Sequence, residues 1–241
     1  MEVIPARIFN FLYVYLDSAW LLALFVIFII KKRYIAIIAG LVGGIIYFIV
    51  DYGVFYLALG TRSVAGAEPA SLLLWLSISY GFTNFAWIWL WLDRDGHALE
   101  WSLLIISGWF ATALLSQNFG SSFATISIQR GTSSYHGVMA AIMLAGYAIL
   151  ILKNIRAASS AENGAKRINI LWILAIGILV QFSWESVLLI TGIRPTGFMP
   201  LIVDSILETN LGLPYLYLIH NAISGKYRED FKRIPQDLLP K

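Results

Sequence analysis

Long apolar runs separated by short polar or turn-forming breaks extend along almost the whole chain. A bilayer core requires about 20 mostly apolar residues per helix. Seven segments approach this length: 11–30, 34–59, 71–92, 100–117, 137–152, 168–191 and 198–220. The pattern predicts an all-α, polytopic membrane protein, with residues 1–241 forming a single domain of seven transmembrane helices. Residues 221–241 are expected to form a cytoplasmic tail.

The composition supports a membrane protein. Hydrophobic residues make up 59% of the chain, charged residues 13%, and the mean hydropathy is +0.75, values that soluble domains do not reach. The chain has no cysteine, which excludes disulfides, thiolate nucleophiles and cysteine-held metal ions. The net charge of +3 comes from basic residues in short connections and in the C-terminal segment, so we predict no nucleic-acid partner.

The distribution of lysine and arginine predicts the orientation. With the N-terminus outside, the inner segments carry 13 basic residues and the outer segments carry 4, one in each segment: Arg7, Arg62, Arg130 and Arg194. Because basic residues are enriched in cytoplasmic loops, we expect the N-terminus outside and the C-terminus inside.

Acidic residues lie within these apolar segments, where an unpaired charge is costly and often functional. They are Asp51, Glu185, Asp204 and Glu208, with Asp17 near the start of the first segment. At about 1.5 Å rise per residue, all five lie within roughly 9–15 Å of the predicted outer boundary. Gln117, Asn118 and His136 lie near the same boundary. Asp204 and Glu208 are four residues apart and therefore share a helix face.

A structural explanation is open for each acid. Asp17 would fit an interfacial position at a helix start. Asp51 or Glu185 would each fit a hydrogen bond to a neighbouring helix. A purely structural role is least expected for Asp204 and Glu208, which share one helix face.

The second and third segments resemble the sixth and seventh. Asp51 aligns with Glu185, and SYGFTNFAWIWLWL aligns with SILETNLGLPYLYL, which matches Thr83-Asn84 with Thr209-Asn210. Parallel repeats of three helices are a known membrane-protein arrangement. We therefore predict half-repeats over 11–92 and 137–220 around the fourth helix. In that arrangement the Asn84 and Asn210 amides face a shared centre.

Several familiar sites are missing from the sequence. The last apolar segment has no lysine, which excludes a retinal Schiff base there. The three histidines are scattered along the chain, so we predict no metal site and no cofactor. The chain contains no GxSxG elbow, P-loop or dinucleotide-binding fingerprint.

Buried carboxylic acids among aromatic residues suit an enzyme that acts on a hydrophobic substrate. Apolar surroundings favour the protonated acid, which can act as a general acid, and aromatic faces stabilise a carbocation. We predict Asp51, Asp204, Glu208 and Glu185 as catalytic residues of an isoprenoid cyclase or isomerase. The predicted substrate-binding residues are Asn84, Asn210, Trp87, Trp184, Tyr47, Tyr52 and Gln181. The expected partner is a hydrophobic small molecule or lipid.

Two other functions fit the same residues. The carboxylates would suit proton or cation coupling in a small-solute transporter with a central site between the half-repeats, in which Pro214, or Gly197 with Pro200, supplies bends. The chain would also suit a non-catalytic role in lipid binding or membrane-protein assembly.

The length, the seven apolar segments and three sequence features resemble a known family. An acid in the second segment, Asp51, and Val203-Asp204-Ser205 in the seventh are similar to motifs of the small transmembrane terpene cyclases of fungal meroterpenoid and indole-diterpene pathways, as is Glu100-Trp101. The resemblance implies acid-initiated cyclisation of a prenylated substrate, with Asp51 and Asp204 as the catalytic acids. The family's Asn-x-Ala-Trp-Glu run is split here: Asn84-Phe85-Ala86-Trp87 lies in the third segment and Trp184-Glu185 in the sixth.

Overall fold

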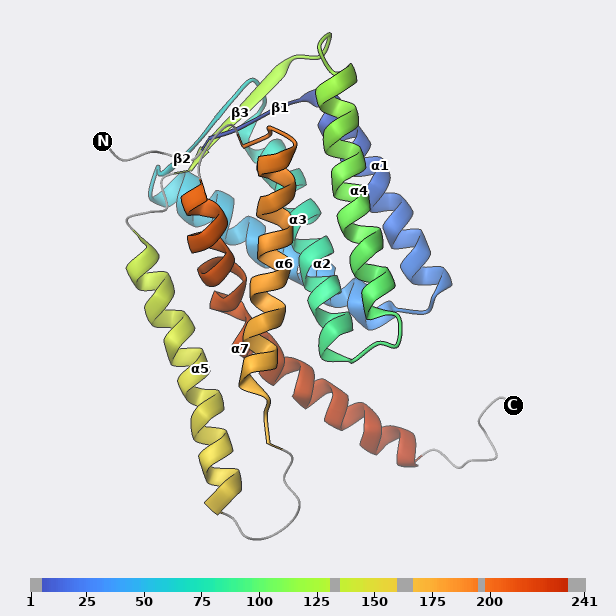
Figure 1. The fold of residues 1–241 in the computed structure, drawn as a ribbon, viewed down its shortest axis with the longest axis vertical. Helices are drawn as coiled ribbons and strands as arrows, with labels where there is room; N and C mark the ends of the chain where they lie inside the picture. The colour runs from blue at the N-terminus through green and yellow to red at the C-terminus, as the bar shows by residue number, and fades with distance from the viewer. Residues whose placement is uncertain (1–5, 131–134, 160–166, 195–197, 234–241) are drawn as a thin grey trace.

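The computed structural model describes residues 6–130, 135–159, 167–194 and 198–233, which fold as a bundle of seven helices (Figure 1). The helices are Phe11–Ile30 (α1), Tyr34–Phe48 (α2), Pro69–Leu92 (α3), Ala98–Phe119 (α4), His136–Ser159 (α5), Ile170–Ile190 (α6) and Phe198–Arg233 (α7). After α2 the chain continues as a π-helix, η1, over Ile49–Ala58. The predicted helical fold is confirmed, although α5 and α7 extend well beyond their predicted ends.

Five of the helices in the described ranges are long and apolar enough to cross a membrane: α1, α2 continued by η1, α4, α5 and α6. Large apolar side chains on their outer surfaces are exposed, for example Leu22 (65%) and Leu171 (77%). Such surfaces are stable in lipid and unfavourable in water. The chain therefore has the character of a membrane protein.

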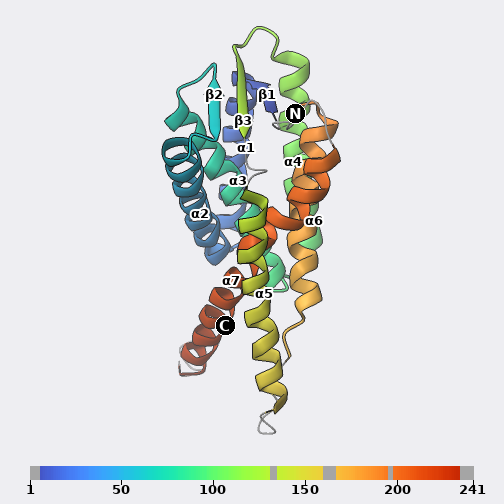
Figure 2. The same ribbon diagram turned by 90° about the vertical axis from the view of Figure 1, so that its left-hand side faces the viewer.

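A small antiparallel sheet, which the sequence analysis did not predict, covers one end of the bundle (Figures 1 and 2). Its strands are Ala6–Asn10 (β1), Arg62–Ala65 (β2) and Thr125–Arg130 (β3), in the order β1-β3-β2. We call this the sheet end, and the opposite end, where α1 joins α2 and α3 joins α4, the loop end. The sheet joins the N-terminal segment to two inter-helix connections that are distant in the sequence.

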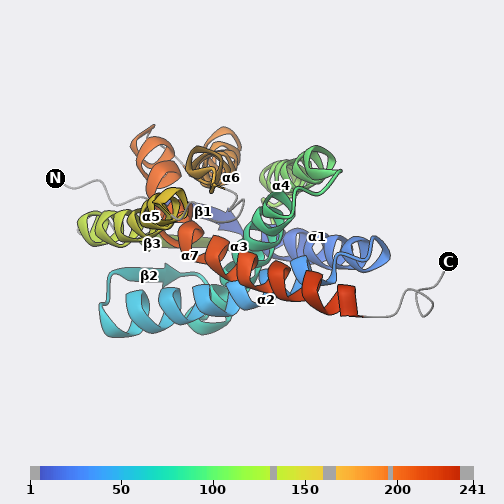
Figure 3. The same ribbon diagram turned by 90° about the horizontal axis from the view of Figure 1, so that it is seen from below.

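Helix α3 is the centre of the bundle and contacts α1, α2, α4, α6 and α7 (Figure 3). Most of its side chains are buried, including Leu73 and Trp87. Its contact with α2 is especially close, because a Cβ atom added to Gly81 would lie 2.3 Å from the Cα atom of Gly44. Small residues that allow backbones to touch are typical of helix packing in membranes.

Helices α5 and α7 are arranged differently from the rest. Helix α5 packs mainly against α7 and exposes most of its surface. Helix α7 changes direction along its length (Figure 1) and contains Pro214, which removes a backbone hydrogen bond and bends a helix. This agrees with the bend predicted at Pro214, whereas Gly197 lies outside the described residues. Helix α7 continues through the predicted tail as far as Arg233, and residues 234–241 lie outside the described ranges.

Candidate functional site

Helices α6 and α7 bring three of the four predicted catalytic acids together. One side-chain oxygen from each of Glu185, Asp204 and Glu208 lies within 4.8 Å of the others. Gln181 and Glu185 on α6 face Asp204 and Glu208 on α7, and each pair has the four-residue spacing of one helix face. We call Glu185, Asp204 and Glu208 the acid cluster.

Arginines from outside the helices reach into the acid cluster. Arg194, just after α6, places Nη2 2.5 Å from Glu185 Oε2 and 4.0 Å from Asp204 Oδ2. Arg7, in β1, places Nη2 3.5 Å from Glu185 Oε1. Glu185 is 1% exposed, and two guanidinium groups compensate its charge. Removal of either partner of such a buried pair is costly.

Gln181 connects Glu185 with Glu208. Its Nε2 atom donates to Glu208 Oε2 at 2.8 Å and to Glu185 Oε1 at 3.4 Å. Its Oε1 atom accepts hydrogen bonds from the Thr209 hydroxyl at 2.8 Å and from the Tyr80 hydroxyl. The amide of this predicted substrate-binding residue is therefore occupied in fixing the positions of the acids.

The alternation of side chains along the strands explains why arginines enter the bundle. Successive strand residues point to opposite faces. In β1, Arg7 lies on the same face as the buried Phe9, and in β2 Arg62 is buried while Ser63 is exposed. The Arg7 guanidinium carbon also lies 5.9 Å from the ring centroid of Trp184, within the range of a cation–π contact.

Asp51 lies apart from the acid cluster. It is the buried residue of η1 and forms a buried ion pair with Arg62 of β2. Among the described residues, the group of acids close enough to share one ion contains Glu185, Asp204 and Glu208, without Asp51. A π-helical segment is rare and often occurs at functional sites; here it carries the acid that ties the second helix to the sheet.

A row of aromatic rings runs through the bundle to the acid cluster. The ring centroids are separated by 5.8 Å between Trp87 and Trp109, 4.9 Å between Trp109 and Trp184, 5.7 Å between Trp184 and Tyr80, and 4.7 Å between Tyr80 and Tyr47. We call these five residues the aromatic row. It includes the predicted residues Trp87, Trp184 and Tyr47.

Gln181 connects the aromatic row to the acid cluster. It accepts a hydrogen bond from the Tyr80 hydroxyl and donates one to Glu208. At the far end, the Trp87 indole nitrogen donates to the Ser102 hydroxyl at 2.7 Å. The predicted residue Tyr52 belongs to a separate stack, in which its ring lies 5.2 Å from Phe48 and 5.4 Å from Tyr56. The structure therefore places Tyr52 outside the aromatic row.

The two asparagines that the repeat predicts as equivalent have different environments. Asn210 accepts a hydrogen bond from the Tyr147 hydroxyl at 2.6 Å and donates to the Ile206 carbonyl at 3.1 Å. Asn84 is 1% exposed, and its amide has no hydrogen-bond partner among the described residues. A buried amide without a partner is unusual.

Sequence reasoning did not assign the arginine partners of the acids or the burial of Asp17. The structure places Asp17 in α1 beside Ser79 and Trp75 of α3, fully buried, so it is not an exposed interfacial residue. His136, expected near this region, lies with Nε2 3.8 Å from Asp204 Oδ1. A signal for the arginines was present, because each predicted outer segment carries one arginine.

Comparison of the chain with protein-family models, with curated proteins and with solved structures finds no match.

Proposed function

We propose that the chain is an intramembrane enzyme in which Asp204 and Glu208 protonate an isoprenoid-like hydrophobic substrate and so start its cyclisation or isomerisation. The observation that carries this proposal is the acid cluster, in which three carboxyl groups converge beside the aromatic row. The resemblance to transmembrane terpene cyclases favours the same chemistry.

The contacts suggest different roles for the three acids. Arg194 and Arg7 contact Glu185 at 2.5 and 3.5 Å, so Glu185 is the charged, positioning member. Asp204 and Glu208 lie beside Glu185 in the acid cluster. Asp204 and Glu208 are therefore the proposed proton-bearing acids, with Gln181 holding Glu208 in place.

The proposed reaction balances without an oxidant or reductant. The carboxylic acid O–H bond breaks, and its proton bonds to an alkene carbon or an epoxide oxygen of the substrate. The alkene π bond or the epoxide C–O bond breaks at the same time, which leaves a carbocation on the neighbouring carbon (and a hydroxyl group in the case of the epoxide). Another double bond attacks the carbocation and closes a ring. A ring C–H then loses its proton to the cluster, which restores the acid. Arg194, 4.0 Å from Asp204, stabilises the transient carboxylate, and the aromatic row stabilises the cation.

The finer membrane arrangement is part of this proposal. We propose seven spans, with the sheet end outside and the C-terminus in the cytoplasm, because basic residues are concentrated in the connections of the loop end. This arrangement places the acid cluster in the outer half of the bilayer. A hydrophobic substrate would reach it from the lipid.

The direct experiment compares Asp204→Asn and Glu208→Gln with the wild-type chain in membranes supplied with prenylated and epoxidised prenylated compounds. Loss of a general acid typically lowers the rate by about 10²–10⁴-fold, so we expect products to fall by that factor for at least one variant. Gas or liquid chromatography with mass spectrometry measures them. The control is Glu100→Gln, because Glu100 is exposed and pairs only with His97 among the described contacts.

Cation-coupled transport is the second candidate, and the same cluster favours it. Three carboxylate oxygens within 4.8 Å of one another can bind a cation. If all compounds are recovered unchanged while proteoliposomes show solute-dependent proton or sodium flux that Asp204→Asn abolishes, transport is correct and the enzyme proposal is wrong.

A further inference from the structure

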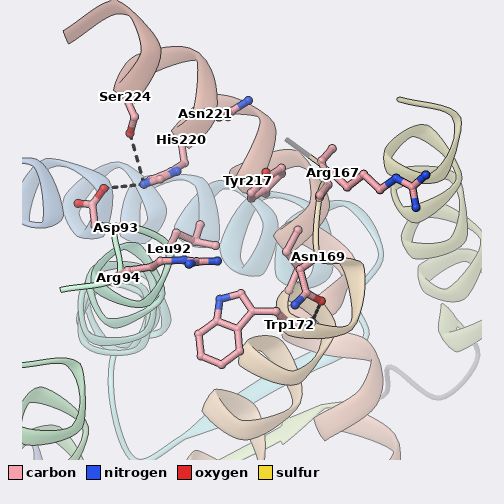
Figure 4. Close-up of a pocket in the computed structure, with 12 residues that line it drawn as sticks. Leu92, Asp93, Arg94, Arg167, Asn169, Trp172, Tyr217, His220, Asn221 and Ser224 are labelled. Carbon is pink, nitrogen blue, oxygen red and sulfur yellow. Dashed lines mark hydrogen bonds and ion pairs between the residues drawn. The ribbon is translucent and has the colours of Figure 1, made fainter. Parts of the chain in front are cut away.

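A second polar cavity lies at the loop end, away from the acid cluster. It has a volume of about 470 Å³ and opens between α3, α6 and α7 (Figure 4). The residues that line it include Arg94, Arg167, Asn169, Trp172, Tyr217 and His220. The proposed chemistry at the sheet end does not use any of them.

The charges around this cavity leave it positive. Asp93 is paired with His220, whose Nε2 lies 2.6 Å from Asp93 Oδ1. In the described part of the chain, the side chains of Arg94 and Arg167 form neither a hydrogen bond nor an ion pair. The Arg94 guanidinium therefore lies at this cavity without a protein partner among the described residues, and Arg167 lies at the rim.

Arg33, near the same cavity, differs from Arg94 because it is paired with an acid. Arg33 Nε lies 2.5 Å from Asp95 Oδ2. Burial raises the pKa of Asp95, but hydrogen bonds from the His97 backbone N–H and from Arg33 lower it, and the net pKa is below its ordinary value. Asp95 thus remains charged and holds Arg33, whereas none of the described acids forms an ion pair with Arg94.

The shape of the cavity suits an anionic group at a membrane interface. Arg94 extends between Tyr217 and the indole of Trp172, while Arg167 lies on the opposite rim and points outward (Figure 4). Arg94 has a left-handed backbone, with φ of 53°, which is uncommon for a residue other than glycine. Asn169 caps α6 through the Trp172 backbone N–H at 3.0 Å, so the positive end of the α6 dipole adjoins the cavity.

We propose that this cavity binds a phosphate-bearing anion, with Arg94 as the principal contact and Arg167 at the rim. Basic pockets between transmembrane helices on the cytoplasmic side bind anionic headgroups, and arginine forms paired hydrogen bonds with phosphate oxygens. Tryptophan and tyrosine are enriched at the same depth. The phosphate could come from a phospholipid headgroup or from a free phosphate.

Native mass spectrometry of the full chain in detergent tests this proposal with three probes: phosphatidylglycerol, phosphatidylcholine and inorganic phosphate. We expect phosphatidylglycerol to bind more tightly than phosphatidylcholine. The Arg94→Gln, Arg167→Gln double variant should weaken phosphatidylglycerol binding on the order of tenfold or more, because each basic residue contributes about fivefold at an anionic surface. Lys153→Gln is the matched control, since Lys153 is exposed and does not line the cavity.

The outcomes separate the sources of the anion. Competition by millimolar inorganic phosphate, or its binding alone, would assign the site to a free phosphate. Binding of phosphatidylglycerol without such competition assigns it to a lipid. Equal binding of both phospholipids together with no phosphate binding overturns the proposal. So does an equal loss in the double variant and in Lys153→Gln, which would indicate diffuse surface attraction. Thermal unfolding in phosphatidylcholine checks that the variants fold.

Discussion

The α2–α3 and α6–α7 helix pairs are built alike but hold different chemistry. In each pair, an acid near the sheet end binds an arginine that follows it in the chain: Asp51 with Arg62 and Glu185 with Arg194. In each, a glycine on the first helix touches the second. Gly44 meets Gly81, and Gly177 meets the side chain of Asn210. These shared features agree with the predicted internal repeat, which stays a prediction.

The difference lies on the second helix of each pair. In the repeat alignment, Asp204 and Glu208 of α7 correspond to Ile78 and Phe82 of α3. Ile78 lies against Gly44 of α2, and Phe82 lies against Gly40. At these positions the interface between α2 and α3 is therefore apolar. The same positions of α7 supply the acid cluster. One helix pair is thus packed through apolar side chains, and the other holds the acid cluster.

The largest expected effect comes from breaking the two acid–arginine pairs. Asp51→Asn and Glu185→Gln each leave a buried guanidinium group without its carboxylate, which typically costs about 3–5 kcal/mol in the free energy of unfolding. The double variant Asp51→Leu, Arg62→Leu should recover part of this loss, because the two charges of the pair leave together. Unfolding in mixed detergent and dodecyl sulfate measures the effect.

The corresponding double variant of the Glu185–Arg194 pair should not recover the lost stability. Glu185→Leu, Arg194→Leu leaves Arg7 without Glu185 and Asp204 without Arg194, since both contacts are present in the structure. If both double variants recover the free energy of unfolding equally, the contacts of Arg7 with Glu185 and of Asp204 with Arg194 do not add to the stability of the acid cluster.

A smaller loss of stability is expected at the apolar interface between α2 and α3. A methyl group at Gly81 would lie 2.3 Å from the Gly44 Cα atom, so Gly81→Ala must separate α2 and α3, at a typical cost of about 1–3 kcal/mol. Gly212→Ala is the control, because the position is helical and an added Cβ meets nothing within 4 Å. Thermal unfolding of the two variants gives the comparison, and similar midpoints would contradict close packing at Gly81.

The smallest change in stability is expected at Asn84 and Asn210, and it should differ between them. Asn210→Leu removes the acceptor for the buried Tyr147 hydroxyl and should cost about 1–2 kcal/mol of stability. Asn84→Leu removes an amide that has no partner among the described residues, so stability should not fall. If Asn84 contacts substrate, product formation should fall although stability does not. A loss of stability equal to that of Asn210→Leu would show that the asparagines are equivalent.

The helices were predictable because a membrane helix leaves a strong signal of length and hydrophobicity. The first predicted segment, 11–30, has the same bounds as α1. The sheet was missed because its strands are four to six residues long. A weak signal was present in Thr125–Gln129, where the buried Ile126 and Ile128 alternate with polar residues.

The acid cluster was partly predictable, because the topology placed Glu185, Asp204 and Glu208 at a similar depth. Their pairing with arginines was not, since Arg7 reaches Glu185 only when β1 pairs with a strand more than 100 residues away. The role of Gln181 likewise depends on Tyr80 and Glu208, which come from two other helices. Contacts between residues that are far apart in the chain cannot be predicted from their spacing in the sequence.

Isotope incorporation during the reaction tests the central proposal most directly. Wild-type membranes are incubated with a prenylated epoxide or polyene in D₂O, and the product is analysed by mass spectrometry. If Asp204 and Glu208 donate the initiating proton, the product of a polyene carries deuterium at the protonated carbon, and the Asp204→Asn, Glu208→Gln double variant forms no product. Undiminished product from the folded double variant would contradict the proposed role of the acid cluster.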